Sequence, residues 1–96
     1  GVASVVAESV IERAVTAEAI RLGWFQRKVK WIGRDGAPDR VYIRGGIILW
    51  VEFKATGQTL RPLQGREHKL LCEAGARVFV VDSVLSGLEL LRVYGE

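Results

Sequence analysis

Apolar positions recur along the chain at two different spacings, and the changes between them predict an alternation of helices and strands. Near the start, Ile11, Val15 and Ala19 follow one another every four residues, as on the buried face of an amphipathic helix. Later segments carry alternating or continuous runs of apolar and β-branched residues, which are typical of strands. We expect the order α-β-β-β-α-β-α, with helices over about 4–22, 62–74 and 84–91 and strands over 24–32, 39–44, 47–55 and 77–82.

The two middle strands should form a hairpin, because Gly45 and Gly46 stand between two apolar runs. A two-residue primed turn needs positive φ at its centre, which glycine adopts freely. With these glycines at the centre, Asp39 faces Glu52 across the hairpin, and Lys54 projects from the same face. Apolar residues occupy both faces, so we expect the hairpin to be covered on both sides.

The opposed carboxylates of Asp39 and Glu52 admit two interpretations. Like charges directly opposite each other destabilise a sheet, so a structure that keeps them needs a compensating charge. A Mg²⁺ ion would supply it, because this ion is usually held by one or two carboxylates together with water and substrate phosphate. Alternatively, the two charges lie at the open end of the hairpin, where water screens them. Geometry alone leaves both interpretations open.

Composition places the chain among globular proteins and excludes several kinds of site. The 96 residues, 49% hydrophobic and 26% charged, predict a single domain over 1–96. Cys72 is the only cysteine, which excludes an internal disulfide, and His68 has no partner at zinc-ligand spacing. No apolar run approaches the roughly 18 residues of a membrane span. We expect a cytoplasmic protein of a bacterium or a phage-infected cell, with neither membrane nor nucleotide cofactor as a partner.

The charge is mildly basic, with a net value of +3 and a sequence pI of about 9.4. Basic residues concentrate around the hairpin and could follow a phosphate backbone. The alternative is that charges of both signs simply keep a small domain in solution. Basic and aromatic residues also interleave over 24–32, although we expect at least one of Trp24 and Trp31 in the core. The candidate DNA contacts are Lys28, Lys30, Arg34, Arg40, Arg61, Arg66 and His68.

Pro38-Asp39 followed by Glu52-Phe53-Lys54 matches the pattern Pro-Asp…(Asp/Glu)-x-Lys. In these residues the chain resembles the PD-(D/E)XK nuclease superfamily, and more narrowly its VRR-NUC (virus-type replication-repair nuclease) domains. The Gly36-x-Pro38-Asp39-Arg40 form and the later Pro62-x-Gln64 stand in the matching order. The resemblance implies an α/β fold, a restriction-endonuclease-like αβββαβα core with a mixed four-stranded sheet flanked by helices.

The same resemblance implies a metal site with defined roles. Asp39, Glu52 and the backbone carbonyl of Phe53 would hold Mg²⁺ or Mn²⁺, which polarises the scissile phosphate and activates water. Lys54 would orient that water and stabilise the developing charge.

An acidic residue of the first helix completes the site in this family, and Glu8 and Glu12 both qualify by position. Glu12-Arg13, with Gly23 closing the helix, is similar to the arrangement in archaeal Holliday-junction-cleaving enzymes, which favours Glu12. Gln64 would assist as a catalytic residue near the metal or the phosphate.

Stand-alone relatives in this family are associated with homodimers that cut branched DNA. The resemblance therefore implies a metal-dependent, structure-specific endonuclease with Holliday junction resolvase-like activity on branched or flap-like DNA. A non-catalytic branched-DNA-binding module with the nuclease fold is the alternative, and a protein-interaction domain is a third hypothesis.

Overall fold

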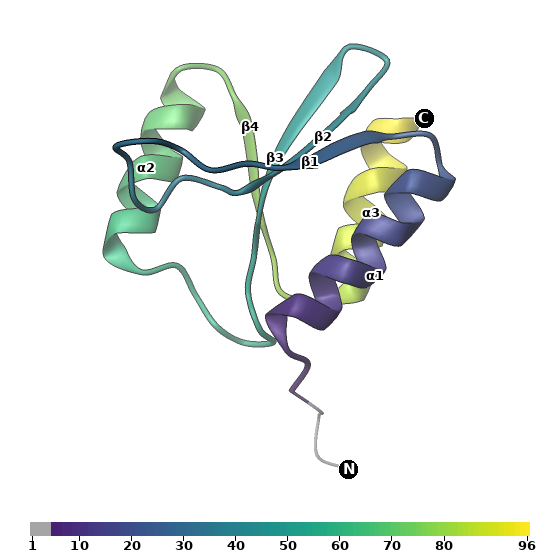
Figure 1. Ribbon diagram of the computed structural model, residues 1–96, viewed down its shortest axis with the longest axis horizontal. Coiled ribbons are helices and arrows are strands. Elements are labelled where there is room, and N and C mark those ends of the chain that lie inside the picture. Colours follow the sequence, from purple (N-terminus) through teal and green to yellow (C-terminus); the bar gives the residue numbers. More distant parts are fainter. Residues whose placement is uncertain (1–4) are drawn as a thin grey trace.

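The computed structural model describes residues 5–96, which form a four-stranded mixed sheet with helices on both of its faces (Figure 1). Strands β1, β2 and β3 are antiparallel neighbours, and β4 pairs in parallel with β3. Helix α2 makes the crossover that a parallel connection requires. The elements are α1 (Glu8–Arg21), β1 (Phe25–Lys28), β2 (Arg40–Arg44), β3 (Ile47–Phe53), α2 (Pro62–Glu73), β4 (Arg77–Val81) and α3 (Val84–Gly95). The predicted fold class and element order are confirmed.

Several predicted element ends were wrong. Helix α1 begins at Glu8, and position 4 of its predicted start lies outside the described residues. Strands β2 and β3 are shorter than expected, at 40–44 and 47–53, whereas α3 continues to Gly95. The largest error concerns β1, which ends at Lys28 instead of continuing to position 32. Beyond Lys28 the N–H of Val29 still donates to the carbonyl of Asp39, at 2.8 Å, and the indole N–H of Trp31 then donates to the carbonyl of Pro38, at 2.7 Å, so a side-chain contact replaces the strand pairing.

The hairpin has the register predicted from its two glycines. Both adopt positive φ, 56° at Gly45 and 82° at Gly46, as a primed turn requires. Arg40 pairs with Val51, so one step further along the strands Asp39 lies opposite Glu52.

One face of the sheet carries the hydrophobic core. Helices α1 and α3 lie side by side on this face (Figure 1), and they bury the side chains of alternate strand residues. Gly87 of α3 allows the close approach of the two helices, because a Cβ there would stand 2.4 Å from a methyl group of Val15. The core consists of Ile11, Val15, Ala19, Trp24, Tyr42, Leu49, Val51, Phe53, Val81 and Leu91. The expectation that at least one of Trp24 and Trp31 lies in the core is confirmed by Trp24.

The opposite face is only partly covered, so the expected cover on both sides is incomplete. Ile48 is exposed there, and α2 lies over the other end of the face. Helix α2 buries Gln64 and His68, whereas Leu63 and Leu70 remain exposed. A buried polar group needs a hydrogen-bond partner, so this reversal of the usual pattern indicates a site between α2 and the sheet. Across residues 5–96, no helix has both the length and the apolar character that crossing a membrane requires.

Candidate active site

The strand geometry brings Asp39 and Glu52 to one end of the face under α2. Pro38 is buried and fixes φ immediately before Asp39. The side chain of Glu52 is 8% exposed, whereas that of Asp39 is 39% exposed. The pair therefore has a buried member and a solvent-facing member, as expected of a site that an ion and a substrate approach from outside.

Gly36 explains why the Gly-x-Pro-Asp segment lies where it does. Its φ is +86°, and a Cβ at this position would stand 2.8 Å from the carbonyl oxygen of Leu63 and 2.9 Å from the amide nitrogen of Gln64. Only a residue without a side chain lets the connection before β2 touch the backbone of α2. This contact sets Asp39 and Gln64 at a defined separation.

Glu52 is held in an environment that opposes its negative charge. Burial and, after it, the neighbouring charge of Asp39 together raise the pKa of Glu52 to about 7, against the opposing effect of Lys54. Nε2 of His68 lies 3.3 Å from Oε1 of Glu52. Burial also lowers the pKa of His68, and the charge of Lys54 acts in the same direction, so the imidazole is neutral at physiological pH. A cation beside Glu52 would remove the cost of ionising it.

Lys54 shares this face and is itself nearly buried. Within residues 5–96 no carboxylate lies within 4.0 Å of its ammonium group. Its backbone N–H donates to the carbonyl of Val81, at 2.9 Å, which fixes the residue just beyond the end of β3. A positioned ammonium that is not already paired with a carboxylate can interact with an anionic substrate.

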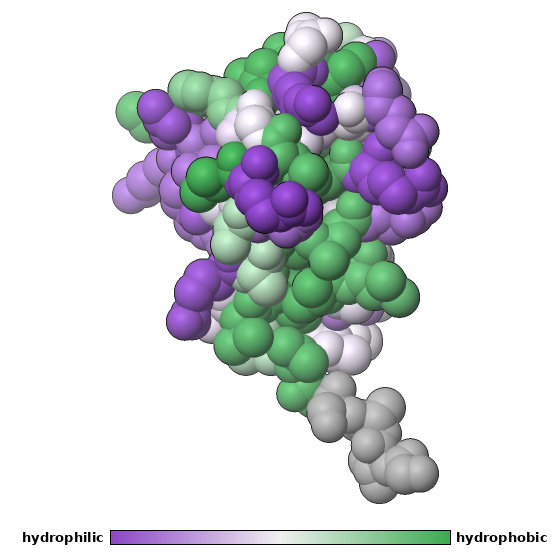
Figure 2. Space-filling model, turned by 90° about the vertical axis from the view of Figure 1, so that its right-hand side faces the viewer, coloured by the Kyte–Doolittle hydropathy of each residue, from purple (hydrophilic) through white to green (hydrophobic). Residues whose placement is uncertain are grey.

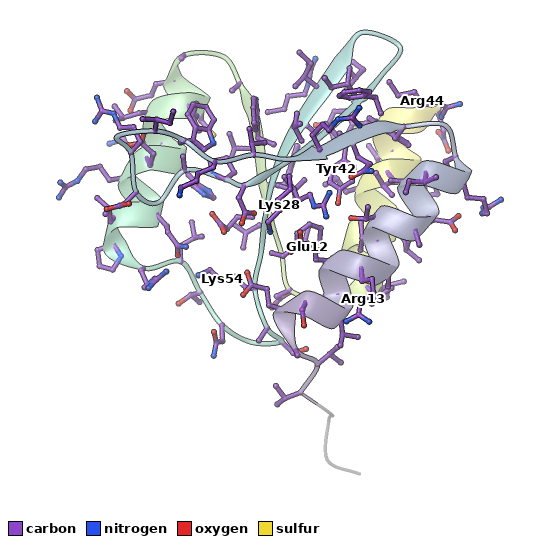
Figure 3. The ribbon with its side chains drawn as sticks, in the orientation of Figure 1. Glu12, Arg13, Lys28, Tyr42, Arg44 and Lys54 are labelled. Carbon is purple, nitrogen blue, oxygen red and sulfur yellow. The ribbon has the colours of Figure 1, made fainter. Side chains whose placement is uncertain are left out.

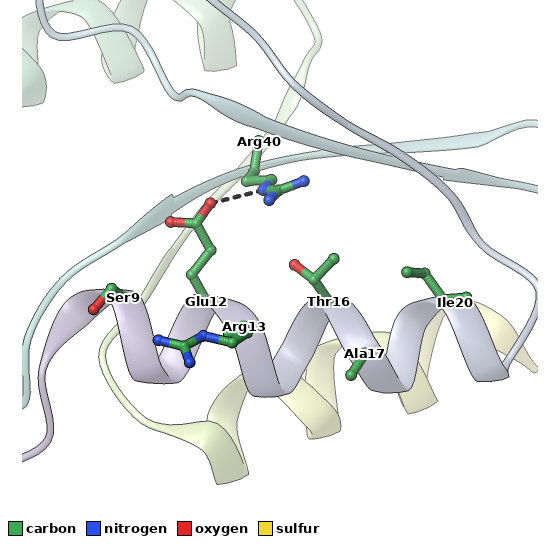
Figure 4. Close-up of a pocket in the computed structure, with 7 residues that line it drawn as sticks. All are labelled: Ser9, Glu12, Arg13, Thr16, Ala17, Ile20 and Arg40. Atoms are coloured by element: carbon green, nitrogen blue, oxygen red, sulfur yellow. Dashed lines mark hydrogen bonds and ion pairs between the residues drawn. The ribbon is translucent and has the colours of Figure 1, made fainter.

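Glu12 joins α1 to the sheet through two cations (Figures 3 and 4). Oε2 of Glu12 lies 2.7 Å from Nε of Arg40 and 2.9 Å from Nζ of Lys28. The same Nζ lies 3.0 Å from Oδ2 of Asp39, so Lys28 bridges the two acids. Burial raises the pKa of Glu12, but the hydrogen bonds from Arg40 and Lys28 outweigh this effect and hold the pKa below its usual value.

The two acids of α1 reach the site differently. Glu12 is linked to Asp39 through Lys28, whereas Glu8, in the first turn of α1, is among the charges that raise the pKa of Glu52. Both carboxylates therefore belong to the surroundings of the hairpin acids. The assignment of the helix acid to Glu12 stays a prediction.

Gln64 is buried beside the site and also caps α2. Its side-chain oxygen accepts a hydrogen bond from the backbone N–H of Arg61, at 2.9 Å. This bond fixes the amide and leaves its NH₂ group available to a ligand.

Besides Lys28, the structure separates the predicted DNA contacts into two groups. Lys30, Arg34, Arg61 and Arg66 are exposed, as contacts to a phosphate backbone need to be. Arg40 is instead tied to Glu12 and to the side chain of Gln26, and His68 is buried against Glu52. Arg40 and His68 therefore contact other side chains of the site. The proposed DNA contacts remain predictions.

Two features of the site did not follow from the sequence reasoning. Lys28 was expected as a DNA contact, yet it lies between two carboxylates. Gln26, which orients Arg40, was not singled out at all. Strand alternation places Gln26 and Lys28 on one face of β1, but their contacts also depend on the pairing of β1 with β2, which the alternation does not predict.

The donor set suits a hard divalent cation. In the described part of the chain, no three side chains among His, Cys, Asp and Glu lie close enough together to hold an ion. Mg²⁺ and Mn²⁺ do not need three such ligands, because one or two carboxylates with water and substrate oxygens suffice. Asp39 and Glu52 fit this requirement, with an adjacent backbone carbonyl at Phe53.

Comparison with known proteins extends the picture. No protein-family model matches the chain. A protein of Acyrthosiphon pisum secondary endosymbiont phage 1 with the name "Putative nuclease p44" is 40% identical over 77 residues, which are 79% of this chain and 83% of the phage protein. A solved structure described as a VRR_NUC domain has a TM-score of 0.79 and 32% sequence identity, and the match covers 91% of this chain and 96% of that one.

The fold and these likenesses define a nuclease-type domain. The chain belongs to the VRR_NUC domain family, which confirms the resemblance read from its motifs.

Proposed function

We propose that this domain is a metal-dependent DNA endonuclease that hydrolyses phosphodiester bonds in branched or flap-like DNA, with a Holliday junction resolvase-like activity. The observation that carries the proposal is the grouping of Asp39, Glu52 and Lys54 on one partly buried face, within a nuclease-type domain. Two acids and a cation in this arrangement suit phosphoryl chemistry, because an ion and a phosphate would each find an opposite charge.

Asp39, Glu52 and the carbonyl of Phe53 are the proposed ligands of Mg²⁺ or Mn²⁺. Such an ion, when bound, polarises a phosphate and lowers the pKa of a bound water. Glu52 would then be ionised at neutral pH, since the ion offsets the burial that now raises its pKa.

The remaining side chains act on the substrate and on the ligands. Lys54 orients the attacking water and stabilises the negative charge that develops on the phosphate. Glu12, with Glu8 as the alternative, closes the site from α1, and Gln64 places its NH₂ group near the phosphate. Lys28 would compete with the ion for Asp39, because its ammonium group lies 3.0 Å from Oδ2 of that carboxylate.

A homodimer would supply two active sites for the two strands of a symmetric junction. Exposed apolar residues support this part of the proposal, among them Val10 of α1 and Leu85 of α3. Figure 2 shows apolar surface on the side of the molecule formed by these helices. Light scattering coupled to size exclusion, with Leu85→Glu as the variant expected to shift the mass to that of a monomer, tests the assembly.

The activity test is a panel of end-labelled four-way junctions, flaps and duplexes, each incubated with Mg²⁺, Mn²⁺ or EDTA. We expect nicking of branched DNA that needs the metal and disappears in Lys54→Ala, Asp39→Ala and Glu52→Ala. Lys69→Ala is the matched control, because Lys69 is an exposed lysine of α2 outside the site. Equal cutting by pure Lys54→Ala would show that the assigned roles are wrong. Salt-sensitive junction binding by the wild type without any cutting would favour the non-catalytic DNA-binding module.

A further inference from the structure

The connection between β1 and β2 carries an apolar side chain that nothing covers. Ile32 is 97% exposed, more than any other large apolar residue in the described part of the chain. Single exposed apolar residues are common and need no explanation by themselves. This one differs because of how the connection is held and what surrounds its tip.

The connection is anchored on both sides of Ile32. On one side, the indole of Trp31 donates to the carbonyl of Pro38 at 2.7 Å and packs on Trp50, with ring centroids 5.2 Å apart. On the other side, Gly36 lies against the backbone of α2. Gly33 follows Ile32 with a φ of +75°, as the third residue of a tight turn does. The fold therefore holds Ile32 out into solvent at the apex of a fixed turn.

Cations flank this apex along the chain. Lys30 and Arg34 are exposed on either side of it, and Lys28 lies at the base of the connection. A hollow of about 450 Å³ lies against the same segment and is lined by these three cations, by Trp31 and by the carboxylates of Asp35 and Asp39, among others. An exposed apolar side chain next to a hollow with three cations suits a partner that has a negatively charged backbone and apolar groups that can stack. Nucleic acid has both properties.

The apex also has a fixed relation to the proposed chemistry. Trp31 holds the carbonyl of Pro38, and the next residue is Asp39. A side chain that enters DNA at the apex would therefore bring nearby phosphates to the cations and to Asp39. Unstacking costs least where bases are already unpaired or poorly stacked, as at a branch point.

We propose that Ile32 is a wedge that inserts between bases next to a branch point, while Lys30 and Arg34 hold the flanking phosphates. This inference rests on the proposed nuclease function and adds to it the residue that selects distorted DNA. A protein partner fits less well, because specific protein interfaces bury about 800 Å² on each side and this tip is one side chain among cations.

Fluorescence of 2-aminopurine tests the wedge without cleavage. The probe is a flap DNA with 2-aminopurine next to the branch point. It is mixed in EDTA with wild type, Ile32→Ser, Ile32→Leu or Leu70→Ser. Leu70→Ser is the control, because it removes another exposed apolar residue, from α2. We expect the wild type, Ile32→Leu and Leu70→Ser to raise the fluorescence as the base unstacks. Ile32→Ser should leave it near the level of free DNA while its Kd rises less than about tenfold, because phosphate contacts carry most of the affinity.

Cleavage rates give a second reading with the same proteins. In Mg²⁺, Ile32→Ser should lose about tenfold in rate on flaps and junctions, the equivalent of one apolar contact in the bound complex. An unchanged fluorescence rise and an unchanged rate in Ile32→Ser would overturn the wedge and leave the nuclease proposal standing. A changed oligomeric mass of Ile32→Ser would also overturn it, in favour of a protein contact. Failure of the wild type to bind or cut any branched DNA would overturn both proposals.

Discussion

The two faces of the sheet differ although they are made from the same strands. The face under α1 and α3 buries apolar side chains such as Tyr42, Leu49 and Phe53 almost completely. The face under α2 buries Glu52, Lys54 and His68 instead, three groups that lose hydration there. Burial of apolar side chains on the first face stabilises the fold, whereas burial of charged and polar groups on the second face lowers its stability. Neighbouring residues of one strand should accordingly respond to substitution in opposite ways.

The largest expected effect is on stability and concerns Phe53. Phe53→Ala should lower the free energy of unfolding by about 3–5 kcal/mol, because it leaves a cavity in the core. A domain of this size has little stability to lose, so much of the variant should be unfolded at room temperature. Urea denaturation followed by circular dichroism measures the change, with the exposed Phe25→Ala as control. A loss below about 1 kcal/mol would contradict the assignment of the core to this face.

The adjacent residue should affect activity and spare stability. Lys54→Met keeps the length of the side chain and removes its charge, so cleavage should slow by about 10²–10³-fold. The free energy of unfolding should stay level or rise, because a nearly buried ammonium without a carboxylate partner is removed. Single-turnover nicking and urea denaturation of the same protein supply both values. If Lys54→Met were active but less stable than wild type, the face under α2 would contribute to stability rather than to activity, contrary to the proposal.

Glu52 should make the metal-free protein less stable as the pH rises. In the folded state its pKa is about 7, against 4.5 for an ordinary glutamate carboxyl group, so the folded state keeps a proton that the unfolded state loses. Stability from this group is complete below about pH 4.5 and is lost by pH 7–8, a change of about 3 kcal/mol.

Glu52→Gln should therefore be the more stable protein at pH 8 in EDTA and nearly equal to wild type at pH 4.5. Both proteins keep His68, so the opposite effect of its lowered pKa cancels in the comparison. Thermal unfolding of both proteins across the pH range provides the measurement. Mg²⁺ at pH 8 should reduce the difference in stability between Glu52→Gln and wild type, because the ion binds the ionised site of the wild type. A difference in stability between the two proteins that does not depend on pH would rule out the raised pKa of Glu52 as its cause.

Gly36→Ala tests the contact that sets the position of the acidic hairpin. The added Cβ would meet backbone atoms of α2 below 3.0 Å, and φ is positive, so we expect a loss of about 2 kcal/mol. Gly33→Ala is the matched control, since its φ is also positive but nothing lies within 4 Å of the added atom. Equal losses in both variants would show that the contact with α2 does not matter.

The smallest expected effect concerns Lys28, the cation between Glu12 and Asp39. Lys28→Met should bind Mn²⁺ about three- to tenfold more tightly, because it removes a charge that competes for Asp39. Isothermal titration calorimetry measures the affinity, with the exposed Lys30→Met as control. Weaker binding in Lys28→Met would mean that Lys28 positions Asp39 for the ion.

The site was predictable from sequence to the extent that it depends on local geometry. Gly45 and Gly46 are enough to place Asp39 opposite Glu52, because a two-residue turn leaves one register. The position of Lys28 was not predictable in this way. Its contacts with Glu12 and Asp39 need α1 and the edge of the sheet to meet, and strand alternation says nothing about the separation of two elements.

By itself, the sequence determined the order of the elements, the hairpin register and the family, because turn chemistry, side-chain alternation and short motifs are local properties of the chain. Only the tertiary structure decided where β1 ends, which side of α2 is buried, and how Gly36 and Ile32 are presented. Those features depend on contacts between segments far apart in the chain, such as Gly36 against α2, whose energies no local pattern contains.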